Sequence, residues 1–185
     1  TDSADLTEAL KGIDVVFHLA AAQHEMDKGD QHFNDVNVQG TKNLLEASKK
    51  AGVKRFLHGS TIGVYGYLSG QITEDSACKP DNIYGKSKYE GEKAVLDFKD
   101  QLDVTVIRIP EVYGPGDRRL LKLFKMARKG RFPLTGSGKN LHHLIYIDDL
   151  IEGFLQAVQS KKSKGSVYLL AGKEAVDTND MVKIV

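Results

Sequence analysis

The sequence lacks the features that mark disulfide-rich, membrane-spanning and nucleic-acid-binding proteins. Its one cysteine, Cys78, cannot form a disulfide within the chain, so a reducing, cytoplasmic setting is the simple expectation. No apolar run is long enough to span a bilayer, and no basic and apolar leader opens the printed sequence. The 26 basic and 25 acidic residues nearly cancel, which argues against a general attraction to nucleic acid or to an anionic membrane.

A glycine-rich turn between a strand and a helix is also missing. No G-x-G-x-x-G segment is present, although such turns hold a pyrophosphate in doubly wound α/β folds. The sequence opens on residues typical of a loop and helix inside a domain, and it ends within a predicted helix. We therefore expect a fragment whose first strand–helix unit lies upstream, and we expect the fragment alone to have negligible affinity for a dinucleotide.

What the sequence does contain is an alternation of short apolar runs with amphipathic stretches. Strands are predicted over 13–19, 53–58, 104–109, 144–147 and 166–170. Helices are predicted over 30–51, about 83–98, 118–129, from 148 or 149 to about 159, and from 177 to 185. Nearly continuous apolar strands are typical of a parallel sheet that is covered on both faces. The predicted fold class is α/β, with a doubly wound parallel sheet.

The clearest chemistry lies in Tyr84 and Lys88. Their separation of four residues places both on one face of a predicted helix. A cation held near a phenol favours the phenolate and lowers the pKa of the tyrosine. Ser60 and Thr61 follow the apolar run at 53–58, and a hydroxyl opposite the pair can hold a substrate oxygen while the tyrosine moves a proton. The set predicts acid/base interconversion of an alcohol and a carbonyl.

Each assignment has a plainer alternative. The Tyr-x-x-x-Lys spacing recurs at Tyr89 and Lys93, and either pair could be an exposed helical contact worth about 0.2–0.5 kcal/mol. We favour the first pair because small Gly85 and Ser87 between its members allow a cofactor to come close. The strand-end hydroxyls could likewise only satisfy a turn.

Three further patterns have structural interpretations. The histidines and aspartates within 142–149 match no zinc spacing, so no metal site is predicted. His18 lies in an apolar run, which favours a satisfied core histidine over a catalyst. The basic face of the helix predicted over 118–129 has no interleaved aromatic residues, so nucleic-acid binding is not favoured.

Six motifs carry a family resemblance. They are DVVFHLAA at 14–21, VNVQGT at 36–41, STIGVYG at 60–66, YGKSK at 84–88, RIPEVYGPGD at 108–117 and IYIDDL at 145–150. In their order they resemble the NAD-dependent epimerase/dehydratase family, or extended short-chain dehydrogenases/reductases, in particular its UDP-glucose 4-epimerase-like members. The resemblance implies a Rossmann-like fold, incomplete at both ends here, with NAD or NADP, a nucleotide-sugar substrate and a homodimer.

The resemblance also implies residue roles. Tyr84 would be the acid/base, and Lys88 would lower its pKa and hydrogen-bond the nicotinamide ribose. Thr61 falls at the family's catalytic Ser/Thr position, and Ser60 lies one position earlier. Further cofactor positions are Leu19, Ala20 and Ala21 against the pyrophosphate and ribose, and Pro110 beside the nicotinamide. Asn37, inside a predicted helix, has either a cofactor-side role or a structural one.

Two residues depart from the sugar-nucleotide members of the family. Glu111 stands where these commonly carry an Asn that helps to hold the diphosphate, and His142 stands where they often carry Arg. A carboxylate near a diphosphate is unfavourable, and a neutral imidazole lacks the bidentate binding of Arg. Arg118 or Arg119 could meet a diphosphate, because the segment after the RIPEVYGPGD motif reaches the family's substrate domain.

Three functions stay open at this point. The first is an NAD(P)-dependent nucleotide-sugar epimerase or dehydratase. The second, favoured by the two departures, is a reductase or dehydrogenase of a smaller carbonyl or a steroid-like alcohol. The third, a non-enzymatic dinucleotide sensor, would not need the intact hydroxyl, tyrosine and lysine set. In each case 1–185 is a partial NAD(P)-binding domain, with substrate-domain segments within about 116–142 and 172–185.

Overall fold

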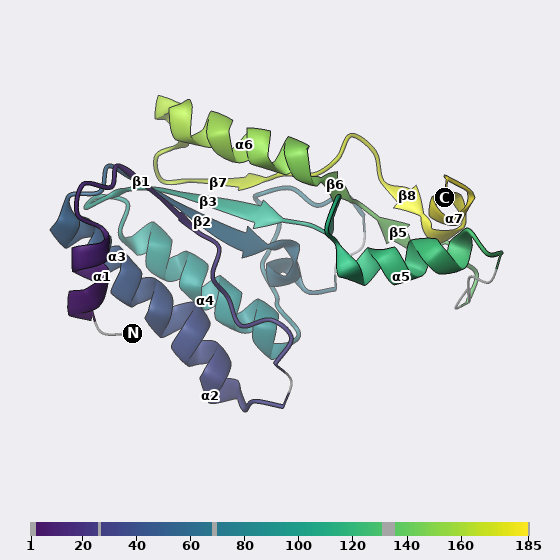
Figure 1. Ribbon diagram of the computed structural model, residues 1–185, viewed down its shortest axis with the longest axis horizontal. Helices are drawn as coiled ribbons and strands as arrows, with labels where there is room; N and C mark the ends of the chain where they lie inside the picture. The colour runs from purple at the N-terminus through teal and green to yellow at the C-terminus, as the bar shows by residue number, and fades with distance from the viewer. Residues whose placement is uncertain (1–2, 26, 68–69, 131–135, 185) are drawn as a thin grey trace. The chain divides into compact units, whose positions relative to one another are not determined.

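A computed structural model describes residues 3–25, 27–67, 70–130 and 136–184 of the 185-residue chain (Figure 1). The chain divides into two compact units. The first comprises Thr1–Ile109 and Phe154–Leu169, and the second comprises Pro110–Gly153 and Leu170–Val185. None of the helices in the described ranges is long and apolar enough to cross a membrane.

The first unit is a four-stranded parallel sheet covered by helices. Its strands are β1 (Val15–His18), β2 (Arg55–Thr61), β3 (Asp103–Ile109) and β7 (Ser166–Leu169), adjacent in that order. On one face lie α3 (Gly40–Ala51) and α4 (Ile83–Asp97), and the C-terminal half of α6 (Ile147–Gln159) lies on the other (Figure 1). The predicted parallel α/β fold is therefore confirmed.

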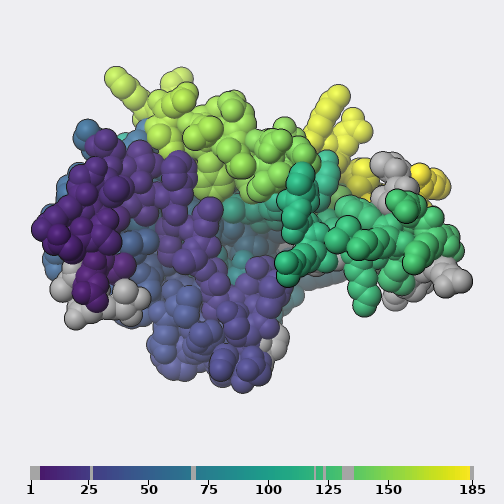
Figure 2. Space-filling view, viewed as in Figure 1, coloured from purple at the N-terminus to yellow at the C-terminus, as the bar shows by residue number. Residues whose placement is uncertain are grey.

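The remaining helical segments of this unit are short. They are α1 (Ser3–Ala9), α2 (Asp30–Phe33), the π-helix η1 (Asn34–Gln39), and the 3₁₀ helices η2 (Ile62–Tyr65) and η3 (Lys161–Ser163). In the space-filling view the N-terminal segments, coloured purple to blue, form one continuous surface of the unit (Figure 2). The single helix predicted over 30–51 is thus corrected to an α-helical turn, a π-helical segment and a longer α-helix.

The core explains why these segments pack as they do. Apolar side chains from three strands, from the residues just before β2 and β3, and from α3 and α4 form one buried cluster, made of Val16, Leu45, Val53, Phe56, Val95, Leu102, Val104 and Val106. The helix α3 ends where the sequence predicts, because Gly52 adopts a left-handed conformation with φ of 76° at its C-terminus. At the start of α4, the side chain of Asn82 accepts a hydrogen bond of 2.9 Å from the backbone N–H of Gly85.

The second unit contains two small strand pairs. A parallel pair joins β4 (Val112–Tyr113) to β6 (Ile145–Tyr146), and an antiparallel pair joins β5 (Leu141–His142) to β8 (Val176–Asp177). Its helices are α5 (Arg118–Ala127), α7 (Thr178–Ile184) and the N-terminal half of α6. The segments 116–142 and 172–185, expected to belong to a substrate domain, fall in this unit, and their role stays a prediction.

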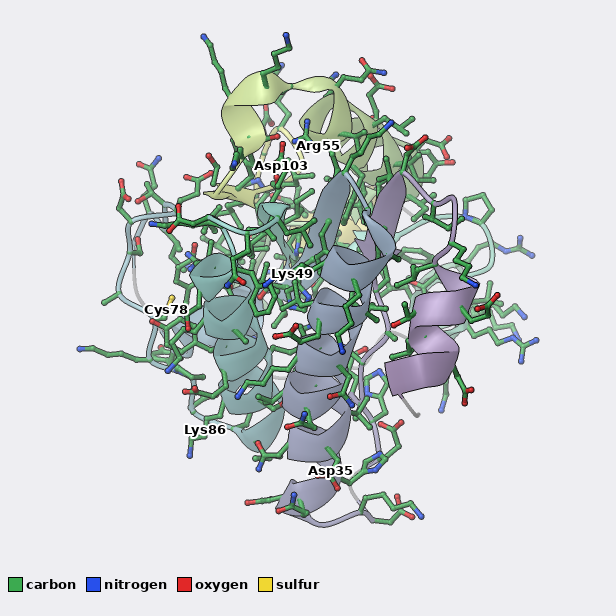
Figure 3. All side chains as sticks on the ribbon, turned by 90° about the vertical axis from the view of Figure 1, so that its left-hand side faces the viewer. Asp35, Lys49, Arg55, Cys78, Lys86 and Asp103 are labelled. Carbon is green, nitrogen blue, oxygen red and sulfur yellow. The ribbon has the colours of Figure 1, made fainter. Side chains whose placement is uncertain are left out.

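Arg55 holds the end of α6 in the first unit. Its guanidinium donates hydrogen bonds to the carbonyl oxygens of Ala157, at 3.1 Å, and Ser160, at 3.0 Å. It also bonds the hydroxyl of Ser163 and lies 3.6 Å from the carboxylate of Asp103 (Figure 3). These groups include carbonyls at the C-terminal end of the helix, which have no partner within the helix itself.

Replacing Arg55 with Met should lower the free energy of unfolding by about 3 kcal/mol, because several half-buried acceptors lose a charged donor. Urea denaturation of the two proteins measures the difference. The matched control is Lys54→Met, which breaks only an exposed ion pair with Asp14 and should cost less than about 1 kcal/mol. Equal losses in the two variants would contradict the helix-anchoring role of Arg55.

Candidate active site

The carboxyl end of β2 and the start of α4 bring Tyr84 and Thr61 together. Their side chains interact although the two residues belong to different elements, and the interaction with Thr61 lowers the pKa of Tyr84. The close approach depends on Gly85, because a Cβ atom there would lie 2.6 Å from the carbonyl oxygen of Gly63, in the turn that follows Thr61. The N-terminal turn of α4 therefore rests on η2 at the end of the strand.

Burial sets the protonation state of Tyr84 in the chain. It raises the pKa of the phenol above 10.0, while the hydrogen bond with Thr61 lowers it in part. The resemblance implies a lowering of this pKa by Lys88, and the chain by itself produces the opposite net shift. At neutral pH Tyr84 is accordingly a neutral phenol that can donate a proton.

Lys88 is a buried cation one helical turn after Tyr84. Its side chain is 2% exposed, and Nζ donates a hydrogen bond of 2.6 Å to the carbonyl oxygen of Gly59 at the end of β2. Burial lowers the pKa of Lys88 from 10.5 to about 8, and the charge of Glu92 acts in the raising direction. The ammonium therefore predominates at neutral pH and loses its proton as the pH rises through about 8.

Two buried histidines lie near this cation. Burial first, and then the charge of Lys88, lowers the pKa of His18 to about 4 and that of His58 well below 6.5. Their rings are 5.2 Å apart. Thr41 donates its proton to a backbone carbonyl, so it accepts from Nε2 of His18 at 2.8 Å. Neither ring nitrogen of His58 has a partner in the described ranges. Both rings are neutral at pH 7, which agrees with the core interpretation of His18.

Ser60 points into a buried ion pair. Its hydroxyl donates a hydrogen bond of 2.9 Å to the carboxylate of Glu92 on α4. Both oxygens of this carboxylate also accept from the guanidinium of Arg108 on β3. The geometry engages Ser60 in packing α4 on the sheet, and of the two strand-end hydroxyls it is Thr61 that meets Tyr84.

Asn37 lies in η1 and is 1% exposed. Its carboxamide oxygen accepts from the backbone N–H of Ala22 at 2.8 Å, and its amide group donates to the Ala22 carbonyl and to the Ser87 hydroxyl, both at 2.9 Å. These bonds use both amide protons, so the geometry fits the structural alternative. Asn37 ties the loop after β1 to the helix that carries Tyr84.

The other cofactor positions expected from the resemblance follow strand ends. Leu19, Ala20 and Ala21 form the loop directly after β1, and Leu19 is 59% exposed. Pro110 directly follows β3. Ligands of open α/β sheets bind outside the carboxyl ends of the strands, and this is where these residues occur.

Two residues that depart from the family pattern contact each other in the second unit. His142 Nδ1 lies 3.1 Å from the Glu111 carboxylate, and its Nε2 lies 3.0 Å from the Thr178 hydroxyl. The sequence identified both residues without predicting their pairing. Arg118 is exposed at the start of α5, and the side chain of Arg119 lies outside the described part of the structure.

The expected absence of a metal site stays a prediction for the whole chain. In the described ranges, no group of three or more histidine, cysteine, aspartate and glutamate side chains is arranged to hold a metal ion. The chemistry of the site in the first unit is that of a phenol, an alcohol and an ammonium.

Comparisons with known proteins connect this geometry to a family. Residues 1–171 match the model of the NAD dependent epimerase/dehydratase family. An Escherichia coli O157:H7 relative, N-acetyl-alpha-D-glucosaminyl-diphospho-ditrans,octacis-undecaprenol 4-epimerase, is 30% identical over 98% of this chain and 56% of its own length. The Arabidopsis thaliana 3beta-hydroxysteroid-dehydrogenase/decarboxylase isoform 2 is 31% identical over 99% of this chain and 34% of its own length.

Solved structures of epimerases also match this chain. UDP-glucuronic acid 4-epimerase from Bacillus cereus, in complex with NAD, superposes with a TM-score of 0.87 at 34% identity, over 100% of this chain and 62% of that one. A second structure of that enzyme also contains UDP-glucuronic acid. The chain thus spans about half to two thirds of the length of most of these proteins.

The close approach of α4 to the end of β2 predicts opposite effects for two glycine-to-alanine substitutions. Gly85→Ala should lower the free energy of unfolding by about 2 kcal/mol, because the new methyl group overpacks against backbone. Gly40→Ala is the control, since its Cβ would meet only one atom, at an ordinary 3.5 Å. It should raise the free energy by up to about 1 kcal/mol through helix propensity. Urea denaturation measures both, and stabilisation by Gly85→Ala would contradict the tight packing.

Proposed function

This chain belongs to the NAD-dependent epimerase/dehydratase family, and from that premise we propose that it carries the acid/base centre of a nucleotide-sugar epimerase or dehydratase. The carrying observation is that Tyr84, whose side chain interacts with Thr61, lies one helical turn before the buried ammonium of Lys88, which is hydrogen-bonded to the end of β2. A phenol, a hydroxyl and a cation in this arrangement suit the reversible oxidation of a sugar carbinol.

Tyr84 moves the proton in this proposal. A sugar hydroxyl binds between Thr61 and Tyr84, and its proton passes to Tyr84 in its phenolate form as the carbon loses hydride. NAD, when bound, supplies the hydride acceptor. In the return direction, Tyr84 gives the proton back to the carbonyl oxygen. Proton transfer of this kind contributes about 10²–10⁴ to a rate.

Lys88 supplies the charge that this proton transfer needs. Burial raises the pKa of Tyr84 in the chain alone, so a base at neutral pH requires a compensating cation. Lys88 is the buried cation on the same helix face, and its effect on the phenol increases when bound ligands exclude water. Lys88 also has donors for a ribose hydroxyl, in the role that the resemblance implies.

The residues present fit the nicotinamide and ribose end of a dinucleotide. The small side chains of Ala20 and Ala21 follow β1 and Pro110 follows β3, all at carboxyl ends of parallel strands. In this loop Leu19 and Ala20 are exposed and Ala21 is half-buried. The printed sequence contains no glycine turn for the pyrophosphate, so we limit the proposed contacts of these residues to that end of the cofactor.

Tyr84→Phe should reduce kcat by at least about 10²-fold in the complete protein with NAD and a UDP-sugar or dTDP-sugar, because the proton carrier is removed. Circular dichroism and the urea midpoint test whether the fold persists. Tyr89→Phe is the matched control, since Tyr89 begins the second Tyr-x-x-x-Lys spacing on the same helix and contacts the exposed Lys93. A near-normal rate for Tyr84→Phe would contradict the catalytic assignment.

A second candidate function is the oxidation or reduction of a smaller carbonyl or a steroid-like alcohol. The observation that favours it is the contact between Glu111 and His142, which occupies both side chains at positions where the resemblance implies diphosphate binding. A carboxylate held at such a position repels a diphosphate. Such an enzyme consumes NADH or NADPH in proportion to product, whereas an epimerase shows no net change in cofactor.

The double substitution Glu111→Asn and His142→Arg should lower the KM for a UDP-sugar about tenfold, since it removes a negative charge and adds a bidentate phosphate donor. Initial-rate kinetics in the complete protein measure it. Glu174→Gln, which removes an exposed negative charge from the same unit, controls for a general change in charge. An unchanged KM in the double variant would show that the pair does not face the phosphates.

A further inference from the structure

The end of β2 is bonded to α4 residue by residue. Three consecutive strand residues each interact with one of three helix residues spaced one turn apart, two of them through hydrogen bonds. The pairs are Thr61 with Tyr84, Gly59 with Lys88, and Ser60 with Glu92. The first two helix residues belong to the proposed reaction, and the third has no role in it so far.

Glu92 is the most heavily bonded residue of this set. It is 1% exposed, and its carboxylate accepts from Ser60 at 2.9 Å and from Nε of Arg108 at 3.2 Å, with a second bond from the same guanidinium. Arg108 also donates to the hydroxyl of Tyr65 at 2.7 Å and to the carbonyl of Glu74 at 2.8 Å. The pair thus connects α4 to both central strands and to the loop before the helix.

A buried ion pair of this kind is weak evidence for stability. Desolvating two charges costs about as much as their attraction returns, and apolar replacements of similar volume are often neutral or stabilising. The position of Glu92, one turn beyond Lys88 on the same helix face, indicates a different benefit. Its carboxylate is the acidic group whose charge acts on the buried ammonium.

We propose that Glu92 is a positioning residue for the reaction: held by Arg108 and Ser60, its carboxylate fixes the register of α4 on β2 and keeps the Lys88 side chain in its charged form. The assignment rests on the proposed function in so far as Lys88 serves Tyr84. Its electrostatic part concerns Lys88 alone, and it can be tested without turnover.

Among the groups around Lys88, Glu92 is the one whose charge raises the pKa of the ammonium. On α4, Tyr84 lies one turn before Lys88 and Glu92 one turn after it, and of these two only Glu92 acts on the pKa of Lys88. On β2 and β1 it faces His58 and His18, which burial keeps neutral. Burial lowers the pKa of Lys88 to about 8, and Glu92 opposes that shift. Without the carboxylate, the amine would lose its proton closer to neutral pH.

The surroundings of Glu92 itself hold two further titratable or charged groups. Arg108 on β3 pairs with it directly, and Cys78, in the loop before α4, lies within electrostatic range, since Glu92 contributes to raising the pKa of this thiol. A neutral thiol and a permanently charged guanidinium do not change charge between pH 6 and 8. Over this range, the titration of Lys88 is the change that Glu92 controls.

The decisive experiment measures the titration of Lys88 directly in the complete protein, by NMR of its ¹³Cε and ¹⁵Nζ nuclei, assigned through Lys88→Arg. Glu92→Gln should lower the pKa of Lys88 by about one unit, because an opposite charge is removed at close range. Glu90→Gln is the matched control, since Glu90 lies on the same helix and pairs with the exposed Lys93. It should leave the titration of Lys88 unchanged.

Turnover gives the second readout. The alkaline limb of the kcat profile should fall through about pH 8 in the natural protein and move down by about one pH unit in Glu92→Gln. KM should change little, because the Glu92 side chain is buried and only 1% exposed. Glu92→Asp, which keeps the charge, should restore the limb at least in part.

Should Glu92→Gln fail to fold because Arg108 is left unpaired, the double variant Glu92→Gln with Arg108→Gln removes both charges. It should again show a lowered Lys88 pKa. A folded variant whose Lys88 titrates as in the natural protein would overturn the proposal. Full turnover by Tyr84→Phe, combined with a shifted Lys88, would instead overturn the proposed function and leave the electrostatic role of Glu92 standing.

Discussion

The packing of α4 against the end of β2 is the constraint on which the candidate site depends. Two glycines of the helix have no room for a side chain: a Cβ at Gly85 would lie 2.6 Å from the Gly63 carbonyl oxygen, and one at Gly91 would lie 2.6 Å from the Asn37 carbonyl oxygen. At such close range a short hydroxyl on the strand reaches a phenol on the helix. The meeting of Thr61 and Tyr84 therefore depends on backbone proximity, which these glycines permit.

This proximity requires polar groups in the interior. The interior on and beside α4 holds two neutral histidines, a buried ammonium and a buried ion pair. Apolar side chains in these positions would be easier to stabilise. His58 has no hydrogen-bond partner in the described ranges, so its burial costs free energy that packing elsewhere must offset. A centre optimised for stability alone would not hold these groups, and we interpret the cluster as a compromise that holds one cation in place near one phenol.

The sequence predicted the strands and helices that have a continuous apolar pattern. It missed features that depend on contacts with residues far away in the chain. The second strand was expected to end at 58, because Gly59, Ser60 and Thr61 are small or polar, yet β2 continues to Thr61 because these three residues pair with Ile107, Arg108 and Ile109 of β3. The π-helical segment over 34–39 leaves no mark in hydrophobic periodicity. The pairing of Glu92 with Arg108 did have a signal: a charge inside an apolar run must find a partner, and one lies on the neighbouring helix.

The two units differ in how far the sequence alone identifies their candidate functional residues. In the first unit, the residues proposed to move the proton lie one helical turn apart, so local spacing narrows the candidates to two pairs, and the small residues Gly85 and Ser87 favour the first. In the second, Glu111 and His142 come from segments 31 residues apart, and only the fold brings them within 3.1 Å of each other. A carboxylate and an imidazole in contact satisfy each other, so each is less available to a phosphate than an amide or a guanidinium at the same position would be. In the proposed function, short-range spacing therefore carries the acid/base residues, whereas the contact that bears on substrate choice is long-range and is not revealed by motifs alone.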